Sequence, residues 1–447
     1  MPSLLDSIAQ AGIAGCGGAG FPTHIKYNTQ ARCLIINAAE CEPLLHTDKF
    51  LLREKTDEII AAAETVRVHL GASEAIIALK KTYKAEIEAL NTALPSCPYI
   101  RLHLLKNFYP AGDEQILTFE VTGRTVPPGG LPIDVGCVVS NAATLYAVHN
   151  AIEGRAFTQK YITVNGAVKN PCVLKVPVGT SFADCLAIAG GSTLNEYAVI
   201  SGGPMMGKAL SMAEAKNAGV TKTTSGLIVL PVNSRTVQYA NLNERQTIRR
   251  ARAACIQCSF CTGLCPRYLL GHPLEPHRIM RRISTDIQWR EKLHCNEALQ
   301  TAALCCECGV CELYACPMQL QPRKINALIK QEMRKSGIKP PRFELAESSR
   351  LFREERKIPT HRTAARAGAG KYYDKAVTHF EQAYPETVSI ALNSHIGVPA
   401  LPIVSVGDKV GLGQLIAQPP DSALGVCYHA SIAGTVTSVE DRITIQR

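Results

Sequence analysis

Residues 255–266, CIQCSFCTGLCP, place four cysteines at the spacing C-x2-C-x2-C-x3-C and end in proline. Residues 305–317, CCECGVCELYACP, repeat this pattern with one more residue in the last gap. Three thiolates at two-residue intervals can wrap one corner of an iron–sulfur cubane, while the fourth cysteine, ahead of the proline, points away. The two runs therefore predict a helical segment that holds two [4Fe–4S] clusters.

The fourth cysteine of each run is expected to reach the cluster of the other run, because it points away from its own. Cys306 breaks the two-residue spacing, so Cys305 is interpreted as the ligand. Structural zinc is the alternative, but zinc sites usually use two separated C-x2-C pairs. The predicted ligand sets are Cys255, Cys258, Cys261 and Cys316 for one cluster, and Cys305, Cys308, Cys311 and Cys265 for the other.

The composition argues against several classes of protein. Of the 447 residues 18 are cysteines, yet no secretion signal precedes them, so a disulfide framework is not expected. The chain has no apolar run long enough to span a bilayer, which predicts a cytoplasmic protein. The formal net charge of +10 is concentrated in residues 323–371, where few aromatic side chains interleave. This pattern favours a solvated basic face over a nucleic-acid site.

Residues 15–23, GCGGAGFPT, match the dinucleotide-binding fingerprint G-x-G-x-x-G. That fingerprint requires a strand before it and a helix after it. Here residues 4–11 have apolar side chains at helical spacing, and Phe-Pro-Thr is expected to interrupt a helix. The glycines still let backbone N–H groups approach an anion closely. We therefore expect a phosphate-binding loop outside a Rossmann fold; a tight turn without a ligand is the alternative.

The remaining patterns predict a multidomain protein of α/β and α+β class. Strands are expected at 33–38, 75–80 and 100–107, helices at 49–70, 83–94 and 113–123, and a strand that runs into a helix at 135–154. A hairpin is expected around Asn165-Gly166. The predicted domains are an α/β domain at 1–155, a small α+β module at 156–235, a helical domain with both cysteine runs at 236–345, a basic linker at 346–385, and an all-β module at 386–447.

Several motifs carry a resemblance to a known superfamily. GCGGAGFPTHIKY, NAAECEP, YPAGDEQ and VVSNAATLYAV, followed by the two cysteine runs, resemble the flavin- and NADH-binding subunit of respiratory complex I and its relative RnfC. The chain is more similar still to the cobalamin reductases of propanediol-utilisation microcompartments, because the segment that resembles the C-terminal β-module precedes the flavin domain in RnfC proteins and follows the clusters here. The resemblance covers nearly the whole chain.

The resemblance implies a fold for each part: a complex I flavin-subunit-like α/β domain, a soluble-ligand-binding β-grasp module, a ferredoxin-like two-cluster domain and a C-terminal barrel-sandwich hybrid. The last of these resembles lipoyl domains, but HASIAGTV at 429–436 lacks the lysine that carries the attached group. A structural role is therefore expected for this module.

The resemblance also implies that the glycine loop holds FMN and that NADH stacks over the flavin. Phe21 and Glu114 are the residues expected beside the reacting nicotinamide, with Glu42 near the polar groups of the nucleotide. The residues expected to hold the flavin and its phosphate are Gly15, Gly17, Gly18, Gly20, Lys26, Asn37, Glu40, Gly112, Asp113, Glu114, Ser140 and Asn141.

The implied activity is NADH-dependent reduction of cobalamin, from cob(III)alamin toward cob(I)alamin, for coenzyme B12 recycling in 1,2-propanediol degradation. The expected partners are cobalamin, an adenosyltransferase and microcompartment shell proteins, without nucleic acid, and the expected location is the cytoplasm inside a bacterial microcompartment. Two alternatives stay open, because no dedicated corrinoid motif is visible. One is an RnfC-like subunit of a membrane-associated NADH:ferredoxin complex, and the other is a corrinoid-binding or scaffold protein with relic sites.

Overall fold

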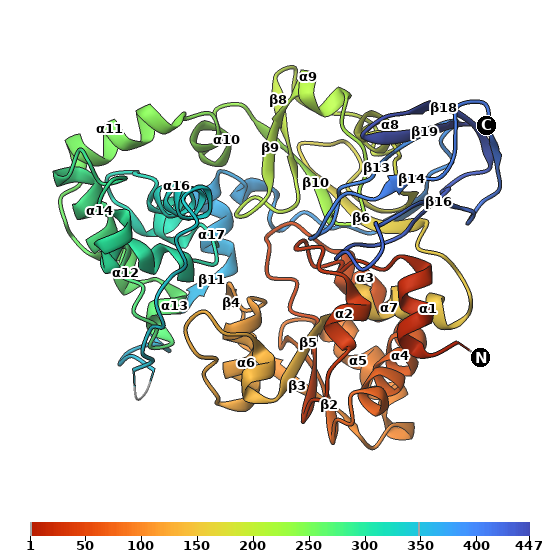
Figure 1. Cartoon of the computed structure of the whole chain (residues 1–447), viewed down its shortest axis with the longest axis horizontal. Helices are drawn as coiled ribbons and strands as arrows, with labels where there is room; N and C mark the ends of the chain where they lie inside the picture. The colour runs from red at the N-terminus through yellow and green to blue at the C-terminus, as the bar shows by residue number, and fades with distance from the viewer. Residues whose placement is uncertain (1, 347–348) are drawn as a thin grey trace.

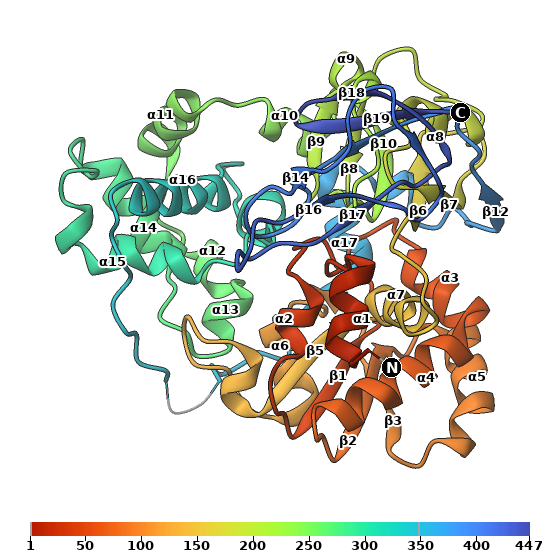
Figure 2. The ribbon, with the colours of Figure 1, turned by 45° about the vertical axis from the view of Figure 1, so that its right-hand side comes forward.

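The computed structural model of the chain describes residues 2–346 and 349–447. Figures 1 and 2 show an N-terminal α/β domain, a helical domain that carries the cysteine runs, and two β-rich modules that lie side by side. The segment that contains α6 and β4 extends from the α/β domain toward the helical domain (Figure 1). This segment places the first domain next to the cysteines.

A four-stranded parallel sheet in the order β3-β2-β1-β5 forms the N-terminal domain. Its strands are β1 (Cys33–Asn37), β2 (Glu74–Lys80), β3 (Ile100–Leu105) and β5 (Cys137–Asn141). Helices cover both faces, which explains the nearly continuous apolar strands. The helices are α1 (Leu4–Ala11), α2 (Thr23–Tyr27), α3 (Thr47–Glu54), α4 (Thr56–His69), α5 (Lys84–Ala93), α6 (Glu114–Thr122) and α7 (Ala142–Ile152).

The strand order reverses direction between β1 and β5. The chain runs outward from β1 to β2 and β3, and then crosses back so that β5 lies on the other side of β1. In open α/β sheets, ligands bind at the carboxyl ends of the strands at such a point. The last residues of these two strands, Asn37 and Asn141, are paired in register there.

Two sequence predictions within this domain are wrong. The single helix expected at 49–70 is two helices, because Lys55 leaves helical geometry and Thr56 begins α4. Phe-Pro-Thr does not end helical structure either, because α2 starts at Thr23 directly after the proline. The segment upstream of the glycine loop is the helix α1, as expected, so no strand leads into the fingerprint.

The second module is a mixed sheet in the order β12-β7-β6-β10-β8-β9 with two helices packed on it. The predicted hairpin exists, but its turn lies at residues 167–171: Asn165 and Gly166 end β6, and Asn165 donates a hydrogen bond to the carbonyl of Leu44 at 3.0 Å. The elements are β6 (Gln159–Gly166), β7 (Cys172–Pro177), α8 (Phe182–Ile188), β8 (Tyr197–Ser201), β9 (Lys208–Ser211), α9 (Met212–Lys216), β10 (Gly226–Pro231) and β12 (His379–Gln382).

The helical domain surrounds the two cysteine runs, with Trp289 almost fully buried in its core. The expected basic linker contributes β11 (Ile358–Pro359), which pairs with β4 (Phe108–Tyr109), and α17 (Thr360–Ala367). The remaining helices are α10 (Arg235–Ala240), α11 (Glu244–Ala254), α12 (Phe260–Gly263), α13 (Pro266–Leu269), α14 (Pro276–Thr285), α15 (Glu297–Gln300), the π-helix η5 (Val310–Ala315) and α16 (Pro322–Lys335).

The C-terminal module packs two small sheets, β13-β19-β18-β15 and β14-β16-β17, around one apolar core. Buried Lys222 joins it to the first two modules, because its ammonium donates to the carbonyl oxygens of Gly12 at 2.5 Å and Cys427 at 2.6 Å. The strands are β13 (Thr387–Ala391), β14 (Leu401–Pro402), β15 (Lys409–Val410), β16 (Leu415–Gln418), β17 (Tyr428–His429), β18 (Gly434–Val439) and β19 (Arg442–Gln446). Among the described residues, the longest helices are too short or too polar to cross a bilayer.

Candidate functional site

The glycine loop offers unoccupied backbone donors. Gly15 donates its N–H to the carbonyl of Phe21 at 2.9 Å, and Cys16 donates to the hydroxyl of Thr144 at 2.9 Å. Within the described parts of the chain, the N–H groups of residues 17–20 donate to no protein acceptor. Gly18 and Gly20 have φ angles of 103° and 71°, which side chains rarely adopt. Such a run of free amides fits the oxygens of a phosphate.

The loop lies over the N-terminus of α7. Asn141 caps this helix by accepting the N–H of Ala143 at 3.0 Å. A Cβ atom built on Gly17 would lie 3.6 Å from the Cβ of Asn141, so the loop and the cap are neighbours. The helix dipole adds positive potential at this end. Gly17, Asn37 and Asn141 thus gather at the point where the strand order reverses.

Residues 112–114 lie at the same edge of the sheet, next to Asn37. Asn37 donates its side-chain amide to the carbonyl of Gly112 at 2.9 Å. Lys26 on α2 pairs with Glu114 at the start of α6, with 2.7 Å between the ammonium and the carboxylate, and both side chains are partly exposed. A partly exposed lysine and free backbone amides are the kinds of donor that a flavin phosphate needs.

Three further predicted site residues, Ser140, Glu40 and Glu42, also contact protein groups. Ser140 is buried, and its hydroxyl lies 2.6 Å from that of Tyr27. Glu40 accepts the N–H groups of Asp48 and Lys49 and so caps α3. These contacts give Ser140 and Glu40 structural partners at the edge of the site, whatever else they bind.

The third, Glu42, contacts Tyr109 and the loop between β8 and β9 of the second module. Its carboxylate accepts the hydroxyl of Tyr109 at 3.1 Å and the N–H of Met205 at 3.0 Å. Burial raises the pKa of Glu42 to about 7. Phe21, by contrast, is held at the glycine loop by its own carbonyl, which accepts the N–H of Gly15.

The cysteines gather in two crossed groups. Cys265, from the first run, lines one cavity together with Cys305, Cys308 and Cys311 of the second run; Cys306, the fifth thiol of this cavity, lies outside the predicted set. In the other group, burial, together with the nearby thiols of Cys316, Cys255 and Cys258, raises the pKa of Cys261 to about 12. These are the two sets that the spacing predicts, and their assignment as ligands stays a prediction. Among the described residues, no three Cys, His, Asp or Glu side chains converge on a single-ion site.

The two cysteine loops share one backbone pattern. In the first, Gln257 and Ser259 have φ angles of 54° and 59°, and in the second, Glu307 and Gly309 have φ angles of 58° and 78°. A helix follows each loop, α12 in the first and the π-helix η5 in the second. The wider turn of a π-helix accommodates one extra residue. The π-helix η5 therefore accounts for the extra residue in the last gap of the second run.

Donors reach the cysteine sulfurs in both groups. The side-chain amide of Gln257 lies 3.1 Å from the sulfur of Cys255. The backbone N–H of Glu307 donates to Cys305 at 3.3 Å, and that of Leu320 donates to Cys316 at 3.3 Å. Hydrogen bonds of this kind stabilise thiolates and tune the potential of a cluster. The donor set therefore fits two iron–sulfur clusters.

The edge formed by the glycine loop, Asn37, Asn141 and residues 112–114 is called the flavin edge below, and the group of Cys265, Cys305, Cys308 and Cys311 is called the second cysteine group. Two contacts join them. The hydroxyl of Tyr109 donates to the carbonyl of Cys308 at 2.7 Å. Asp113 caps α6 and also pairs with Arg267 at 2.7 Å, and both side chains are nearly buried. Arg267 follows Cys265 by two residues. Neither Tyr109 nor Arg267 was among the predicted site residues, although Tyr109 begins the YPAGDEQ motif and Arg267 lies two residues after a predicted ligand.

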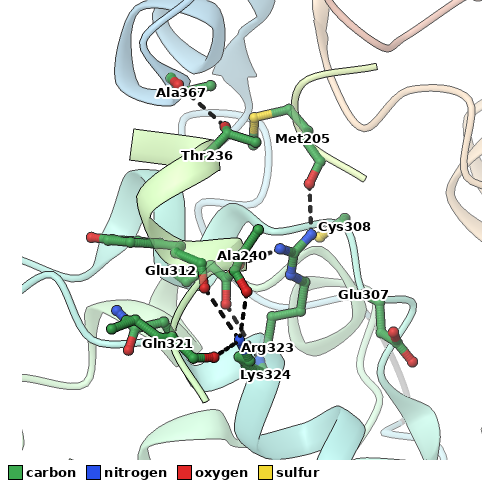
Figure 3. Close-up of polar contacts among 12 residues, drawn as sticks. Met205, Thr236, Ala240, Glu307, Cys308, Glu312, Gln321, Arg323, Lys324 and Ala367 are labelled. Atoms are coloured by element: carbon green, nitrogen blue, oxygen red, sulfur yellow. Dashed lines mark hydrogen bonds and ion pairs between the residues drawn. The ribbon is translucent and has the colours of Figure 1, made fainter. Parts of the chain in front are cut away.

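Figure 3 shows how the second cysteine loop is anchored. Arg323 on α16 donates to the carbonyl of Met205 at 2.6 Å and pairs with buried Glu312 at 2.5 Å. Lys324 donates to the carbonyl of Ala240 at 3.3 Å. Arg323 also lines the cavity of the second group beside Cys308 (Figure 3). A cation there would stabilise the more negative, reduced state of a cluster.

Four family models match successive parts of the chain. They are the Nuo51 FMN-binding domain at 8–150, the SLBB domain at 161–209, the 4Fe-4S dicluster domain at 254–321 and the RnfC barrel sandwich hybrid domain at 368–447. Their order confirms the predicted fold class. The FMN-binding model covers the glycine loop and the strand ends described above.

Curated relatives match over nearly the whole length. Cobalamin reductase PduS of Salmonella typhimurium is 39% identical over 451 residues, which is 99% of this chain and 96% of that protein. The chain belongs to the cobalamin reductase PduS family. The Citrobacter freundii protein of the same name is 39% identical over 100% of this chain and 96% of its own. A component of the Na+-translocating ferredoxin:NAD+ oxidoreductase complex of Acetobacterium woodii is 32% identical over 59% of this chain and 57% of its own.

Membership of this family confirms several predictions at once. The protein is an oxidoreductase of the superfamily that the sequence motifs indicated, with an FMN-binding domain and a 4Fe-4S dicluster domain. The relation to RnfC is also confirmed, by the match to the Acetobacterium woodii component and by the RnfC domain model. The individual flavin-, nucleotide- and cluster-binding residues stay predictions.

Asp48 is a buried acid next to the flavin edge. Its carboxylate accepts the side-chain amide of Asn141 at 2.8 Å and lies close to Glu40. Burial, together with the charge of Glu40, raises the pKa of Asp48 to about 8. The native protein therefore holds a proton at Asp48 that the unfolded chain releases near the ordinary pKa of 3.8.

We expect Asp48→Asn to flatten the pH dependence of stability. Between pH about 4 and about 8 the native state binds more protons than the unfolded chain, so wild-type stability falls as pH rises. An asparagine still accepts from Asn141 but carries no charge. At pH 9 the variant should be more stable than wild type by about 1–3 kcal/mol, with little difference at pH 4. Urea denaturation followed by circular dichroism measures this, and equal slopes in the two proteins would contradict it.

Proposed function

We propose that this protein is an NADH-dependent flavo-iron–sulfur reductase that delivers electrons to cobalamin, taking cob(III)alamin toward cob(II)alamin and cob(I)alamin. The observation that carries the proposal is the direct contact between the flavin edge and the second cysteine group through Tyr109 and Asp113. The near full-length similarity to proteins named cobalamin reductase supports the choice of acceptor.

The flavin edge has a distinct task for each of its parts. The free amides of residues 17–20 and Lys26 would hold the FMN phosphate, while Asn37 and the carbonyl of Gly112 would position the ring system. Glu114 and Phe21 would receive NADH. Bound FMN supplies the exchange between a hydride and single electrons. The exposed side of the Lys26–Glu114 pair leaves room for the nucleotide to enter.

The two cysteine groups would hold the clusters that carry electrons away from the flavin. Cys265, Cys305, Cys308 and Cys311 would hold the cluster nearer to the flavin edge, since Tyr109 contacts this group directly. The group of Cys255 and Cys316 would hold the cluster farther along. Such clusters carry one electron at a time. Exposed residues Ile256 and Phe260 in the first cysteine loop mark the surface that a corrinoid would approach.

The biological setting is part of the proposal. We place the activity in coenzyme B12 recycling during 1,2-propanediol degradation, inside a bacterial microcompartment, with an adenosyltransferase and shell proteins as partners. The support is the family name shared with the curated relatives. Co-purification of the adenosyltransferase with the tagged protein from cells grown on propanediol would test it.

The second candidate function is that of an RnfC-like protein that exchanges electrons with ferredoxin at a membrane complex. The similarity to a component of a ferredoxin:NAD+ oxidoreductase complex and the matching barrel sandwich hybrid domain favour it. An anaerobic assay driven by NADH decides between the two. Cobalamin, ferredoxin and a quinone analogue are offered separately to the purified, fully loaded protein. Preferred reduction of cobalamin supports the first function, and preferred reduction of ferredoxin supports the second.

The two half-reactions should be separable by mutation. Glu114→Ala is expected to slow flavin reduction by NADH about tenfold or more, because it removes the carboxylate expected beside the nucleotide. Glu153→Ala, an exposed carboxylate at the far end of α7, is the matched control and should leave the rate unchanged. Stopped-flow absorbance at the flavin band measures both. Equal rates for Glu114→Ala and wild type would remove Glu114 from the nucleotide site.

A further inference from the structure

A second cavity lies apart from the flavin edge. Its volume is about 640 Å³, and it is enclosed by α7, the first residues of β6, Lys175 on β7 and the loop at Leu412 of the C-terminal module. In Figure 2, β6 and β7 lie above α7. The volume is typical of small-molecule sites. None of the predicted flavin, nucleotide or cluster residues lines this cavity.

The charges around the cavity are mostly positive. Its basic side chains are Lys55, Arg155, Lys160 and Lys175, and Glu58 is the one carboxylate among its lining residues. Glu58 is already paired with Lys55 at 3.0 Å. The excess of cations selects an anion.

Lys160 is the strongest sign of a ligand. Only 5% of its surface is exposed, and it lines the cavity. In the described parts of the chain, its ammonium has no hydrogen-bond or ion-pair partner within bonding distance. The nearby acid, Asp48, is directed to Asn141 instead. An anion in the cavity would supply the partner that this nearly buried lysine lacks among the described residues.

Aromatic rings form the other part of the wall. Tyr146 and Tyr161 meet edge to face with their centroids 5.7 Å apart, and Phe157 lines the cavity beside them. Tyr161 is fixed further by Phe50 and Phe380. Rings that are held in place by their neighbours offer a preorganised surface for a planar group.

We propose that this cavity is a second ligand site, separate from the flavin edge, which binds a phosphate monoester that carries an aromatic ring, such as a mononucleotide. Lys160 and Lys175 take the phosphate, and Tyr146 and Tyr161 contact the ring. The site adjoins Cys16 of the glycine loop and, through Asp48, Asn141 of the flavin edge. A ligand here therefore lies next to the flavin domain without occupying its binding edge.

The test is calorimetric titration of the flavin-loaded protein with 5′-AMP, adenosine and inorganic phosphate. AMP should bind with one site per chain, and adenosine about tenfold or more weakly, because it lacks the group that the lysines recognise. Equal binding of AMP and adenosine, or no binding of AMP, would overturn the proposal. Inorganic phosphate that binds as tightly as AMP would overturn the role of the rings.

Variants locate the site. Lys160→Gln should weaken AMP binding about tenfold, with flavin content unchanged. Lys208→Gln, an exposed lysine on β9 in the same module, is the control and should bind AMP as wild type does. Lys175→Gln provides the second variant if Lys160→Gln does not fold. Glu114→Ala should keep full AMP affinity. The contrary result is that Glu114→Ala loses AMP binding while Lys160→Gln and Lys175→Gln retain it. In that case AMP binds at the nucleotide site of the flavin edge, and the proposal fails.

Discussion

Cys308→Ala is expected to remove one of the two clusters and to lower the iron content from about eight to about four atoms per chain. Cys308 is buried and lines the cavity that it shares with Cys265, Cys305, Cys306 and Cys311, and Cys306 is the one thiol of this cavity outside the predicted ligand set. Anaerobic iron and sulfide analysis measures the loss. The flavin content should stay the same, because the glycine loop belongs to a separate domain.

Two other cysteine variants complete this experiment. Cys295→Ala is the matched control, because Cys295 is exposed and lies outside both runs. Cys306→Ala should also keep about eight iron atoms, since the spacing makes Cys305 the ligand. Loss of a cluster in Cys306→Ala would show that Cys306, and not Cys305, is the ligand. Stoichiometric zinc without sulfide in the wild-type protein would refute iron–sulfur clusters altogether.

Gly17→Val is expected to lower flavin occupancy at least about tenfold while both clusters are retained. The protein itself has room for the side chain, because the nearest atom to a Cβ at this position is 3.6 Å away. The new side chain would instead cover the free amides of the loop. The flavin is released with acid and quantified by fluorescence.

Gly411→Val is the control for Gly17→Val, since Gly411 lies in open space on the C-terminal module and does not need a left-handed conformation. It should keep full flavin occupancy. If Gly17→Val also retained flavin at the wild-type level, the glycine loop would be an ordinary turn. In that case the free amides would carry no phosphate.

Local patterns in the sequence predicted those features that depend on few residues. The cysteine spacing anticipated two crossed groups, because a ligand loop is only a few residues long. The apolar run 33–38 predicted β1, since a strand buried on both faces is apolar throughout. The break at Lys55 was missed, because the apolar periodicity continues across it and only the packing of α3 and α4 requires it.

Features that depend on contacts between domains could not be predicted. Asn165-Gly166 has the composition of a hairpin turn, but its asparagine is used to bind the carbonyl of Leu44 in another domain. Glu42 was expected near the nucleotide and Asp113 at the flavin; both stay predictions, and the structure adds contacts of Glu42 with Met205 and of Asp113 with Arg267. No local signal distinguishes a carboxylate that faces a ligand from one that faces a neighbouring domain.

The central claim is that electrons from NADH reach cobalamin through the flavin edge and the cysteine groups. The most direct test is anaerobic stopped-flow mixing of the loaded wild-type protein with NADH and cob(III)alamin, with absorbance followed at the flavin, cluster and corrinoid bands. The account predicts that the flavin band changes first, the cluster bands next and the corrinoid band last. A corrinoid band that changes while the clusters stay oxidised, or that does not change at all, would contradict it.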